Sequence, residues 1–292
     1  MVKYGNIIYK FELKKMIDKI LKKIFLKLPN KYQIIVKNEY VRLPRFKWIP
    51  RNFINGAYFM ALKNKKFNNF NRFEQRIYSQ NGEDGITKAI FYKIKTTNKF
   101  CVEFGTEDSR ECNTRYLIKK GGWKYLHMDG GENLPNTIKR EFITAENIND
   151  LLKKYQVPEE FDLLSIDIDF NDYFVWKAIK DYNPRVVIIE YNSSIPPTES
   201  KVIKYEANRR WDHTNYFGAS LLALAKLGKT KGYTLVACDN RGVNAFFIRD
   251  ELILNQFEVK NVQDIYRAPK YGVKINGKYI GHPPSIESMI AI

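Results

Sequence analysis

The chain has 292 residues, of which 44% are hydrophobic, enough for one large domain or for a medium-sized domain with an appendage. Its three cysteines have no CxxC spacing, which argues against a disulfide framework or a zinc site and favours a reducing, cytoplasmic compartment. No apolar run reaches the roughly 18 residues that span a bilayer, and the first residues lack the pattern of a secretory signal.

The net charge of +17 is unevenly distributed. Residues 1–70 hold 17 Lys and Arg against 3 Asp and Glu, whereas residues 71–292 hold 32 against 29. The basic N-terminal quarter is typical of segments that meet an anionic membrane, a nucleic acid or an acidic partner, although a solvated lysine-rich face has the same composition. The rest of the chain is nearly neutral.

Residues 8–28 predict a basic amphipathic helix that ends near Pro29. Apolar side chains recur at helical spacing from Leu13 to Leu28, and lysines fill the opposite face. Such a helix can lie in the interface of an anionic membrane, or it can dock on its own domain through the apolar stripe. Residues 31–70 are basic and aromatic and predict an irregular connecting arm, so residues 1–70 form the first predicted region.

Between residues 71 and 250, apolar strand-like runs alternate with helical patterns, which predicts a parallel sheet covered on both faces. Residues 251–292 are polar and predict an extension that packs on this domain as loops. The predicted strands are 100–104, 124–128, 138–143, 163–168 and 186–189, followed by a closing hairpin of 234–237 and 244–248. The predicted helices are 74–95 with an interruption at 79–85, 110–120, 146–155 with Thr144 as N-cap, 172–182 and 217–229.

Acidic residues stand where four of these strands end. Glu103 precedes Gly105 by two positions, Asp129 follows the second strand, and the strands at 163–168 and 186–189 end in carboxylates. Parallel α/β sheets bind ligands at the carboxyl ends of their strands, and an acid after the second strand accepts hydrogen bonds from ribose hydroxyls in nucleotide-binding folds. The set of four predicts a ligand site at this edge of the sheet.

At these positions the chain resembles the class I S-adenosylmethionine-dependent methyltransferases, and within them the FkbM-like family, over about residues 79–250. The resemblance implies a Rossmann-like sheet of seven mostly parallel strands, with an antiparallel last strand and helices on both faces. Ser109 and Phe170 stand where the family often has glycine. The segments that carry the resemblance are Ser79-Gln-Asn-Gly-Glu-Asp-Gly85, Val102-Glu-Phe-Gly105, Glu111-Cys-Asn-Thr-Arg115, His127-Met-Asp-Gly-Gly131, Leu164-Ser-Ile-Asp-Ile-Asp169 and Val187-Ile-Ile-Glu-Tyr-Asn192.

The resemblance also implies where S-adenosylmethionine would bind. Glu103 and Gly105 would line its methionine and ribose end, and Asp129 would hold the ribose hydroxyls. Ala145-Glu-Asn147 would border the adenine, and Asp167 would lie beside the transferable methyl group. The complete predicted cofactor-binding set is Glu103, Gly105, Thr106, Ser109, Asp129, Gly130, Asn147 and Asp167.

Methyl transfer to a hydroxyl requires alignment of the two reactants and removal of a proton. The candidates for catalysis are Asp167, Asp169, Glu190 and His213, the last in a long loop that follows the fifth strand. Asp167 and Glu190, at the ends of adjacent strands, could instead hold a divalent cation such as Mg²⁺ that acidifies a sugar hydroxyl.

These observations favour an S-adenosylmethionine-dependent O-methyltransferase acting on a sugar, glycan or glycolipid precursor. It would be cytoplasmic, peripheral at the inner face of the membrane through residues 8–28, and the sequence leaves its oligomeric state open. One alternative is a nucleic-acid methyltransferase that uses the basic arm on phosphates. The other is a non-catalytic binding module, favoured by Glu107 and Ser109 in a loop that the family usually keeps rich in glycine.

Overall fold

The computed structural model describes residues 40–43, 46–50, 69–253 and 256–292, and the chain divides into two compact units, Met1–Phe67 and Asn68–Ile292. In the first unit, β1 (Tyr40–Leu43) and β2 (Phe46–Pro50) pair as an antiparallel hairpin. The prediction of an irregular arm is wrong here, because these two short stretches are rich in the β-branched and aromatic residues that favour strands. The helix predicted at 8–28 lies outside the described residues.

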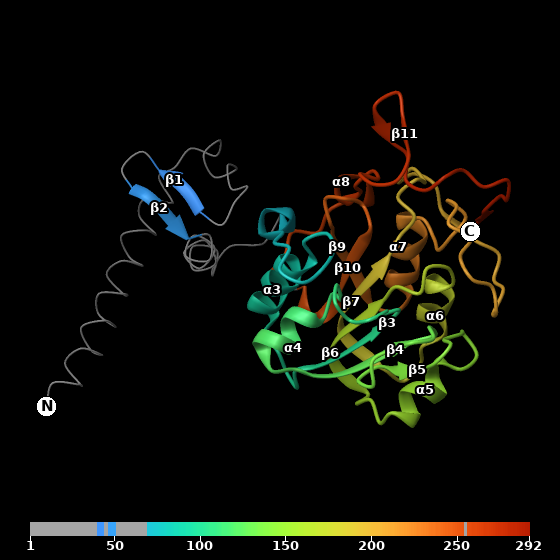
Figure 1. Ribbon diagram of the computed structural model, residues 1–292, viewed down its shortest axis with the longest axis horizontal. Helices are drawn as coiled ribbons and strands as arrows, with labels where there is room; N and C mark the ends of the chain where they lie inside the picture. The colour runs from blue at the N-terminus through green and yellow to red at the C-terminus, as the bar shows by residue number, and fades with distance from the viewer. Residues whose placement is uncertain (1–39, 44–45, 51–68, 254–255) are drawn as a thin grey trace, which may run out of the picture. The chain divides into compact units, whose positions relative to one another are not determined.

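The second unit contains a seven-stranded sheet in the order β5-β4-β3-β6-β7-β10-β9 (Figure 1). Neighbouring strands are parallel except for β10, which runs antiparallel to both β7 and β9. The predicted Rossmann-like fold with an antiparallel last strand is therefore confirmed. The strands are β3 (Phe100–Phe104), β4 (Lys124–Asp129), β5 (Lys139–Arg140), β6 (Glu160–Ile166), β7 (Asn183–Glu190), β9 (Tyr233–Cys238) and β10 (Asn244–Arg249).

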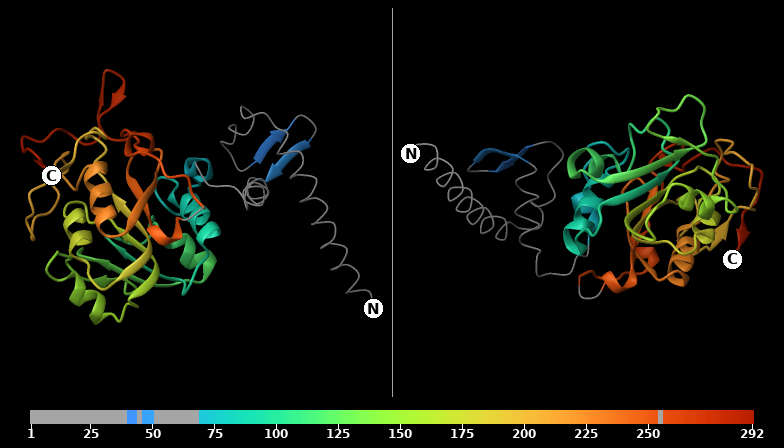
Figure 2. Two further views of the ribbon diagram at one scale, coloured as in Figure 1. Left: turned by 180° about the vertical axis from the view of Figure 1, so that it is seen from behind. Right: turned by 90° about the horizontal axis from the view of Figure 1, so that it is seen from below.

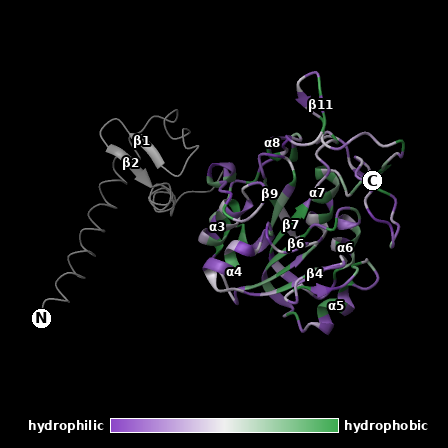
Figure 3. Cartoon of the chain, in the orientation of Figure 1, coloured by the Kyte–Doolittle hydropathy of each residue, from purple (hydrophilic) through white to green (hydrophobic). Residues whose placement is uncertain are grey.

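Helices cover both faces of this sheet (Figures 1 and 2). Helices α5, α6 and α7 contribute to one apolar cluster with alternate strand residues such as Val102 and Phe104, while α3 and α4 lie over the other face. Hydrophobic residues concentrate in the central strands, and hydrophilic residues are frequent in the surrounding loops and helices (Figure 3). The helices are α3 (Glu83–Ile94), α4 (Arg115–Gly121), α5 (Ile148–Lys154), α6 (Asp172–Ala178), α7 (Leu221–Thr230), α8 (Val262–Ile265) and the 3₁₀ turns η2 (Phe70–Phe73) and η3 (Asp250–Leu252).

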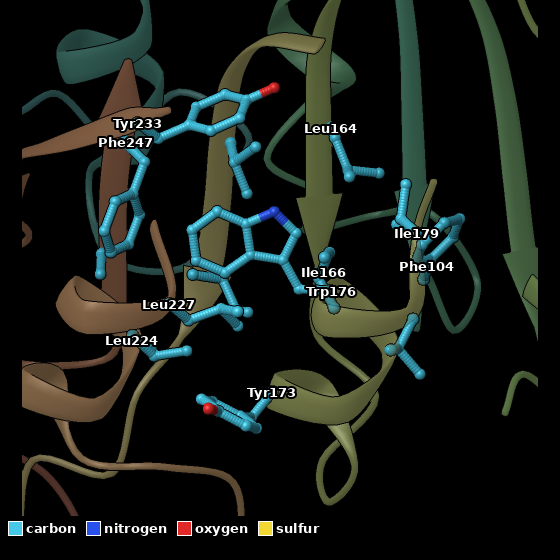
Figure 4. Close-up of a cluster of buried hydrophobic side chains, with 14 of the residues drawn as sticks. Phe104, Leu164, Ile166, Tyr173, Trp176, Ile179, Leu224, Leu227, Tyr233 and Phe247 are labelled. Carbon is cyan, nitrogen blue, oxygen red and sulfur yellow. The ribbon is translucent and has the colours of Figure 1, made fainter. Parts of the chain in front are cut away.

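Trp176 on α6 is the largest fully buried side chain of the described residues. Its ring lies against Phe247 at 4.9 Å between centroids and against Tyr233 at 6.0 Å, with Leu224 and Leu227 of α7 beside it (Figure 4). This cluster joins α6 and α7 to the antiparallel end of the sheet, so the loops that follow β6 and β7 start from a rigid base.

Two helices begin later than predicted because carboxylates bind the backbone N–H groups ahead of them. Asp84 accepts hydrogen bonds from the N–H groups of Ile77, Tyr78 and Ser79, so residues 74–82 form a compact loop. The helix predicted from residue 74 therefore begins at Glu83, inside the interruption predicted at 79–85. Glu103 in the same way accepts the N–H groups of Asn113 and Thr114, and α4 begins at Arg115 instead of Arg110. Helix caps bind backbone N–H groups from neighbouring residues, whereas these two carboxylates bind N–H groups that are five to eleven residues away in the sequence.

The other predicted helices are shorter than expected at one or both ends. Helix α5 has Asn147 at its N-cap position, and Thr144 instead exchanges hydrogen bonds with Asn147 one turn earlier. Helix α6 stops at Ala178, and α7 begins after Ser220, whose hydroxyl accepts the N–H of Ala223. A hydroxyl cap of this kind fixes a helix start that periodicity alone does not define.

A buried ion pair links β6 and β7 near their amino-terminal ends. Arg185 on β7 donates to Asp162 on β6 at 2.8 Å, and also to the carbonyls of Ile94 and Lys95. Asp162 is fully buried and also accepts N–H groups of Thr97 and Lys99. The loop between α3 and β3 is thereby held to two central strands.

The C-terminal extension returns over the sheet edge that carries the predicted site. It forms mostly loops, as predicted, with a small hairpin of β11 (Lys274–Ile275) and β12 (Lys278–Tyr279). Its final strand β13 (Ile290–Ala291) pairs with β8 (Lys201–Val202) in the loop after β7. In the described part of the chain, no helix is both long enough and apolar enough to cross a bilayer.

Candidate active site

The site lies at the topological switch point of the sheet, between β3 and β6. β3 has β4 on one side and β6 on the other, so the connections from β3 and β6 diverge and leave a crevice at their carboxyl ends. Gly105 occupies this point with φ +69°, and its N–H donates to the carbonyl of Met128. A Cβ at this position would lie 1.4 Å from the carbonyl oxygen of Asp167, so only glycine lets the two strand ends approach this closely.

Two adjoining cavities open from this crevice. The aromatic cavity, of about 360 Å³, is lined by Phe142, Ile143, Ile168, Phe170 and His213 among others. The acidic cavity, of about 450 Å³, is lined by carboxylates, notably Glu83, Glu103, Asp167 and Glu190. Their common wall consists of Gly105, Glu107, Asp129, Asp169 and Trp211.

Asp129, at the end of β4, faces both cavities. Its Oδ2 accepts the N–H of Glu107 at 2.8 Å, and its Oδ1 accepts the N–H of Gly131 at 2.7 Å. Each carboxylate oxygen can accept a further hydrogen bond. Asp129 is therefore held in place by the backbone while retaining two acceptor sites for a ligand.

Glu103, in contrast, uses both of its carboxylate oxygens in hydrogen bonds within the protein. Both of its oxygens accept hydrogen bonds, from the N–H of Asn113 at 2.8 Å and from the N–H and hydroxyl of Thr114 at 3.0 and 2.5 Å. Burial raises the pKa of Glu103, and these donors act in the opposite direction by favouring the charged form. Its main effect is to position the loop between β3 and α4.

A second buried contact supports the same loop from below. Ser109 Oγ lies 3.0 Å from His127 Nδ1, and the other ring nitrogen of His127 lies 2.8 Å from the Thr114 hydroxyl. Burial and the nearby Arg115 lower the pKa of His127 to about 4, which keeps the ring neutral. Ser109 has φ +62°, a conformation that glycine adopts without strain and that is uncommon for other residues.

Asp167, Asp169 and Glu190 come together in the acidic cavity, with one oxygen of each lying within 4.8 Å of the others. Desolvation raises the pKa of all three carboxyls, although Asp169 is exposed and Asp167 and Glu190 are half-buried, and the repulsion of neighbouring carboxylates raises it further. Asp172, at the start of α6, has its pKa raised to about 7, again chiefly by burial. This is an unusual concentration of acidic groups beside a crevice.

The segment 203–217 passes over the aromatic cavity and is tied to the loop before α5. The Tyr205 hydroxyl donates to Glu146, and the guanidinium of Arg210 lies 5.6 Å from the ring centre of Phe142. Arg209 lies against the rings of Phe170 and Tyr216, at 5.0 and 5.1 Å. Arg209, Arg210, Trp211 and His213 of this segment line the cavity.

Trp211 separates the two cavities with a histidine on either side. The ring centre of His213 lies 4.7 Å from that of Trp211, and His282, from the C-terminal extension, lies 4.5 Å from it. Tyr271 continues the row, 5.2 Å from His282. Burial, and secondly the neighbouring His213, lower the pKa of His282. Trp211, Tyr271 and His282 form an aromatic wall of the cavity that the carboxylates also line.

Most of the residues predicted from the sequence meet around the two cavities. Glu103, Thr106, Asp167 and Glu190 line the acidic cavity, Gly130 and His213 line the aromatic one, and Gly105, Asp129 and Asp169 line both.

Ser109 and Asn147 line neither cavity. Ser109 is turned toward His127, and the Asn147 side chain accepts the N–H of Thr144 and donates to the carbonyl of Phe142. Their assignment to cofactor binding stays a prediction.

Sequence reasoning missed several residues that line the cavities: Phe142, Asn244, Tyr271 and His282. Phe142 stands two positions after β5 and three before Ala145, where the segment that the resemblance places beside the adenine begins, so its nearness to that segment was a usable signal. Asn244 begins β10 directly opposite Glu190, a pairing that the register of the hairpin determines. Tyr271 and His282 come from loops whose path no periodicity in the sequence defines.

Comparison with known proteins adds a distant structural likeness. No protein-family model matches the chain, and no curated protein matches it. Five chains of solved structures match, among them the CMeT domain of the citrinin polyketide synthase, with a TM-score of 0.32 and 10% identity over 60% of this chain and 55% of that one. The resemblance to the FkbM-like family stays a prediction, and the fold assignment rests on strand order: the second unit is a Rossmann-like α/β domain with its candidate site at the switch between β3 and β6.

Proposed function

We propose that the chain is an S-adenosylmethionine-dependent O-methyltransferase whose acceptor is a hydroxyl of a sugar, glycan or glycolipid. The observation that carries the proposal is Asp129, held at the end of β4 with free acceptor capacity between two adjoining cavities. Ribose hydroxyls are the natural partners of a carboxylate at this place in a nucleotide-binding sheet.

The two cavities suit the two ends of this cofactor. Phe142, Ile143 and Ile168 offer apolar surface for an adenine ring. The carboxylates of the acidic cavity suit the cationic amino and sulfonium groups of the methionine end, and Thr106 there is 4% exposed with a hydroxyl that lacks a partner among the described residues. When bound, S-adenosylmethionine supplies an electrophilic methyl carbon.

The protein's own part in the reaction is to align the acceptor and take its proton. Desolvation and the repulsion of neighbouring carboxylates make Asp167, Asp169 and Glu190 stronger bases than ordinary carboxylates. His213, across the common wall near Asp169, can take or relay the same proton. These four residues are the ones proposed for catalysis.

The aromatic wall supports a carbohydrate acceptor. Sugars present an apolar face of C–H groups, which packs on aromatic rings, and a rim of hydroxyls, which donate to carboxylates. Trp211, Tyr271 and His282 offer such rings, and acidic groups line the same cavity. Loss of an apolar ring would weaken binding of any acceptor that stacks there.

Titration of the full chain with S-adenosylmethionine, followed by calorimetry, tests the cofactor. We expect saturable binding to the wild type and about 10–100-fold weaker binding to Asp129→Asn, because hydrogen bonds to a charged acceptor contribute about 1.5–3 kcal/mol. Asp150→Asn changes an exposed aspartate on α5 and serves as the matched control with unchanged affinity. No binding to the wild type, or equal binding to Asp129→Asn, would contradict the proposal.

Residues 8–28 lie outside the described residues, and their composition supports a location at the inner face of the membrane. We expect the full chain to sediment with anionic liposomes at low salt, and a variant lacking residues 1–30 to stay in the supernatant. Neutral liposomes serve as the control. Equal sedimentation of the two proteins with anionic liposomes would reject this location.

A further inference from the structure

The small hairpin of the C-terminal extension projects from the second unit (Figures 1 and 2). Its strands β11 and β12 pair antiparallel, and Asn276 and Gly277 form the turn between them with φ of +49° and +78°. Positive φ at both central residues is typical of the type I′ turn, in which Asn-Gly is a preferred pair. The sequence of the turn therefore specifies a hairpin with a defined tip.

Backbone contacts close the base of this hairpin. The N–H of Val273 donates to the carbonyl of Gly281 at 2.7 Å, and the N–H of Ile280 donates to the carbonyl of Val273 at 3.0 Å. A Cβ on Gly272 would lie 2.0 Å from the carbonyl oxygen of Gly281, so the two chain segments meet there as closely as glycine allows. The hairpin leaves the domain from a tightly closed base.

Apolar side chains of the hairpin are exposed to solvent. Ile275, beside the turn, is 51% exposed, Tyr279 is 40% exposed and Val273 is 36% exposed. A two-stranded hairpin alone is marginally stable in water, and a group of exposed apolar side chains marks a surface that meets a partner. The tip of the hairpin therefore suits an environment that removes these side chains from water.

The charge around the hairpin indicates the kind of partner. Residues 265–286 contain four Lys and Arg residues and no Asp or Glu. Lys274 and Lys278 are both exposed, and Lys274 Nζ lies 4.5 Å from the ring centre of Tyr279. Tyrosine is enriched at the membrane–water interface, and clustered lysines are attracted to anionic lipid headgroups. This combination matches the surface of an anionic membrane.

We propose that the β11–β12 hairpin is a contact site for an anionic lipid surface, separate from residues 8–28. Ile275 and Tyr279 enter the headgroup region, where the tyrosine hydroxyl stays hydrated, and Lys274 and Lys278 lie beside lipid phosphates. Two copies of this positively charged hairpin would repel one another, which disfavours self-association through it.

The hairpin adjoins the acidic cavity. Tyr271 precedes it and His282 follows it, and both line that cavity. Contact of the tip with a membrane brings the cavity close to the lipid surface, where a sugar hydroxyl of a glycolipid is within reach. This narrowing of the acceptor to a glycolipid rests on the proposed function, whereas the lipid contact itself does not.

A fluorescent label at the tip tests the contact in the full chain. The three native cysteines are buried, so an environment-sensitive nitrobenzoxadiazole label attached to Ile275→Cys reports on the hairpin alone. With vesicles of equal parts phosphatidylcholine and phosphatidylserine, we expect its emission to rise and to shift to shorter wavelength, because the label leaves water. Vesicles of phosphatidylcholine alone, and the same label on Lys120→Cys of α4, should show no change.

Charge reversal provides a second measurement. The double variant Lys274→Glu and Lys278→Glu should sediment with the anionic vesicles at least about tenfold more weakly, because each lysine near such a surface contributes about fivefold. Lys119→Glu with Lys120→Glu makes the same change of charge on α4 and should have a much smaller effect. Equal weakening in the two double variants would show that total charge decides binding, and would overturn the hairpin contact.

The failure of this inference is distinguishable from failure of the proposed function. An unchanged label in the presence of anionic vesicles would overturn the hairpin contact, even if sedimentation still depended on residues 1–30. An emission change that grew with protein concentration in the absence of vesicles would assign the hairpin to a second copy and would also overturn it. A shifted label together with no binding of S-adenosylmethionine would support the lipid contact and refute the methyltransferase.

Discussion

Alanine in place of Gly105 is expected to abolish measurable binding of S-adenosylmethionine and to destabilise the fold by more than about 2 kcal/mol. The new Cβ would lie 1.4 Å from the carbonyl oxygen of Asp167, so the ends of β3 and β6 must separate. Because Gly105 also has φ +69°, alanine adds the intrinsic penalty of the left-handed region, about 1–2 kcal/mol. Calorimetric titration and chemical denaturation measure the two effects.

Gly122→Ala is the matched control for this experiment. Gly122 has φ +66° at the end of α4, and a Cβ there would have nothing within 4 Å. It should lose only about 1–2 kcal/mol of stability and bind the cofactor normally. If Gly105→Ala bound S-adenosylmethionine as well as Gly122→Ala, the crevice between β3 and β6 would not be the cofactor site.

Alanine in place of Asp162 is expected to destabilise the fold by about 3–5 kcal/mol, because it leaves a buried guanidinium without its counter-charge. Arg185 is 5% exposed and would keep only the carbonyls of Ile94 and Lys95. The N–H groups of Thr97 and Lys99 would also lose their acceptor. The midpoint of urea denaturation measures the loss.

Glu160→Gln provides a control on the same strand. Glu160 forms an exposed ion pair with Arg249, in which the Glu160 side chain is 66% exposed. Exposed pairs contribute about 0–1 kcal/mol, so this variant should stay near wild-type stability. A similar loss in the two variants would show that burial does not decide the strength of the Asp162–Arg185 pair.

The sequence predicted the strands better than the helices, for a physical reason. Strands that are buried on both faces have nearly continuous apolar sequences. The strands predicted at residues 100–104 and 186–189 are accordingly found as β3 and β7. The starts of α3 and α4 depend on Asp84 and Glu103, which bind backbone N–H groups five to eleven residues away. Local periodicity contains no information about such contacts.

The residues of the candidate site likewise fall into those that local sequence predicts and those that it does not. Acids at strand ends were predictable because parallel strands bring their carboxyl ends to one edge, as Asp129, Asp167 and Glu190 illustrate. Asn244 required the register of β10 against β7, and His282 required the path of a loop that follows the sheet. Those two contributions come from tertiary structure alone.

The buried contacts under the β3–α4 loop define where each hydrogen lies. The Thr114 hydroxyl gives its hydrogen to Glu103, so its oxygen must accept the hydrogen on Nε2 of His127. A neutral imidazole then has a bare Nδ1, and this atom can only accept the hydrogen of the Ser109 hydroxyl. A single tautomer therefore satisfies all four side chains, and Ser109 has no hydrogen left to offer the carboxylate of any ligand.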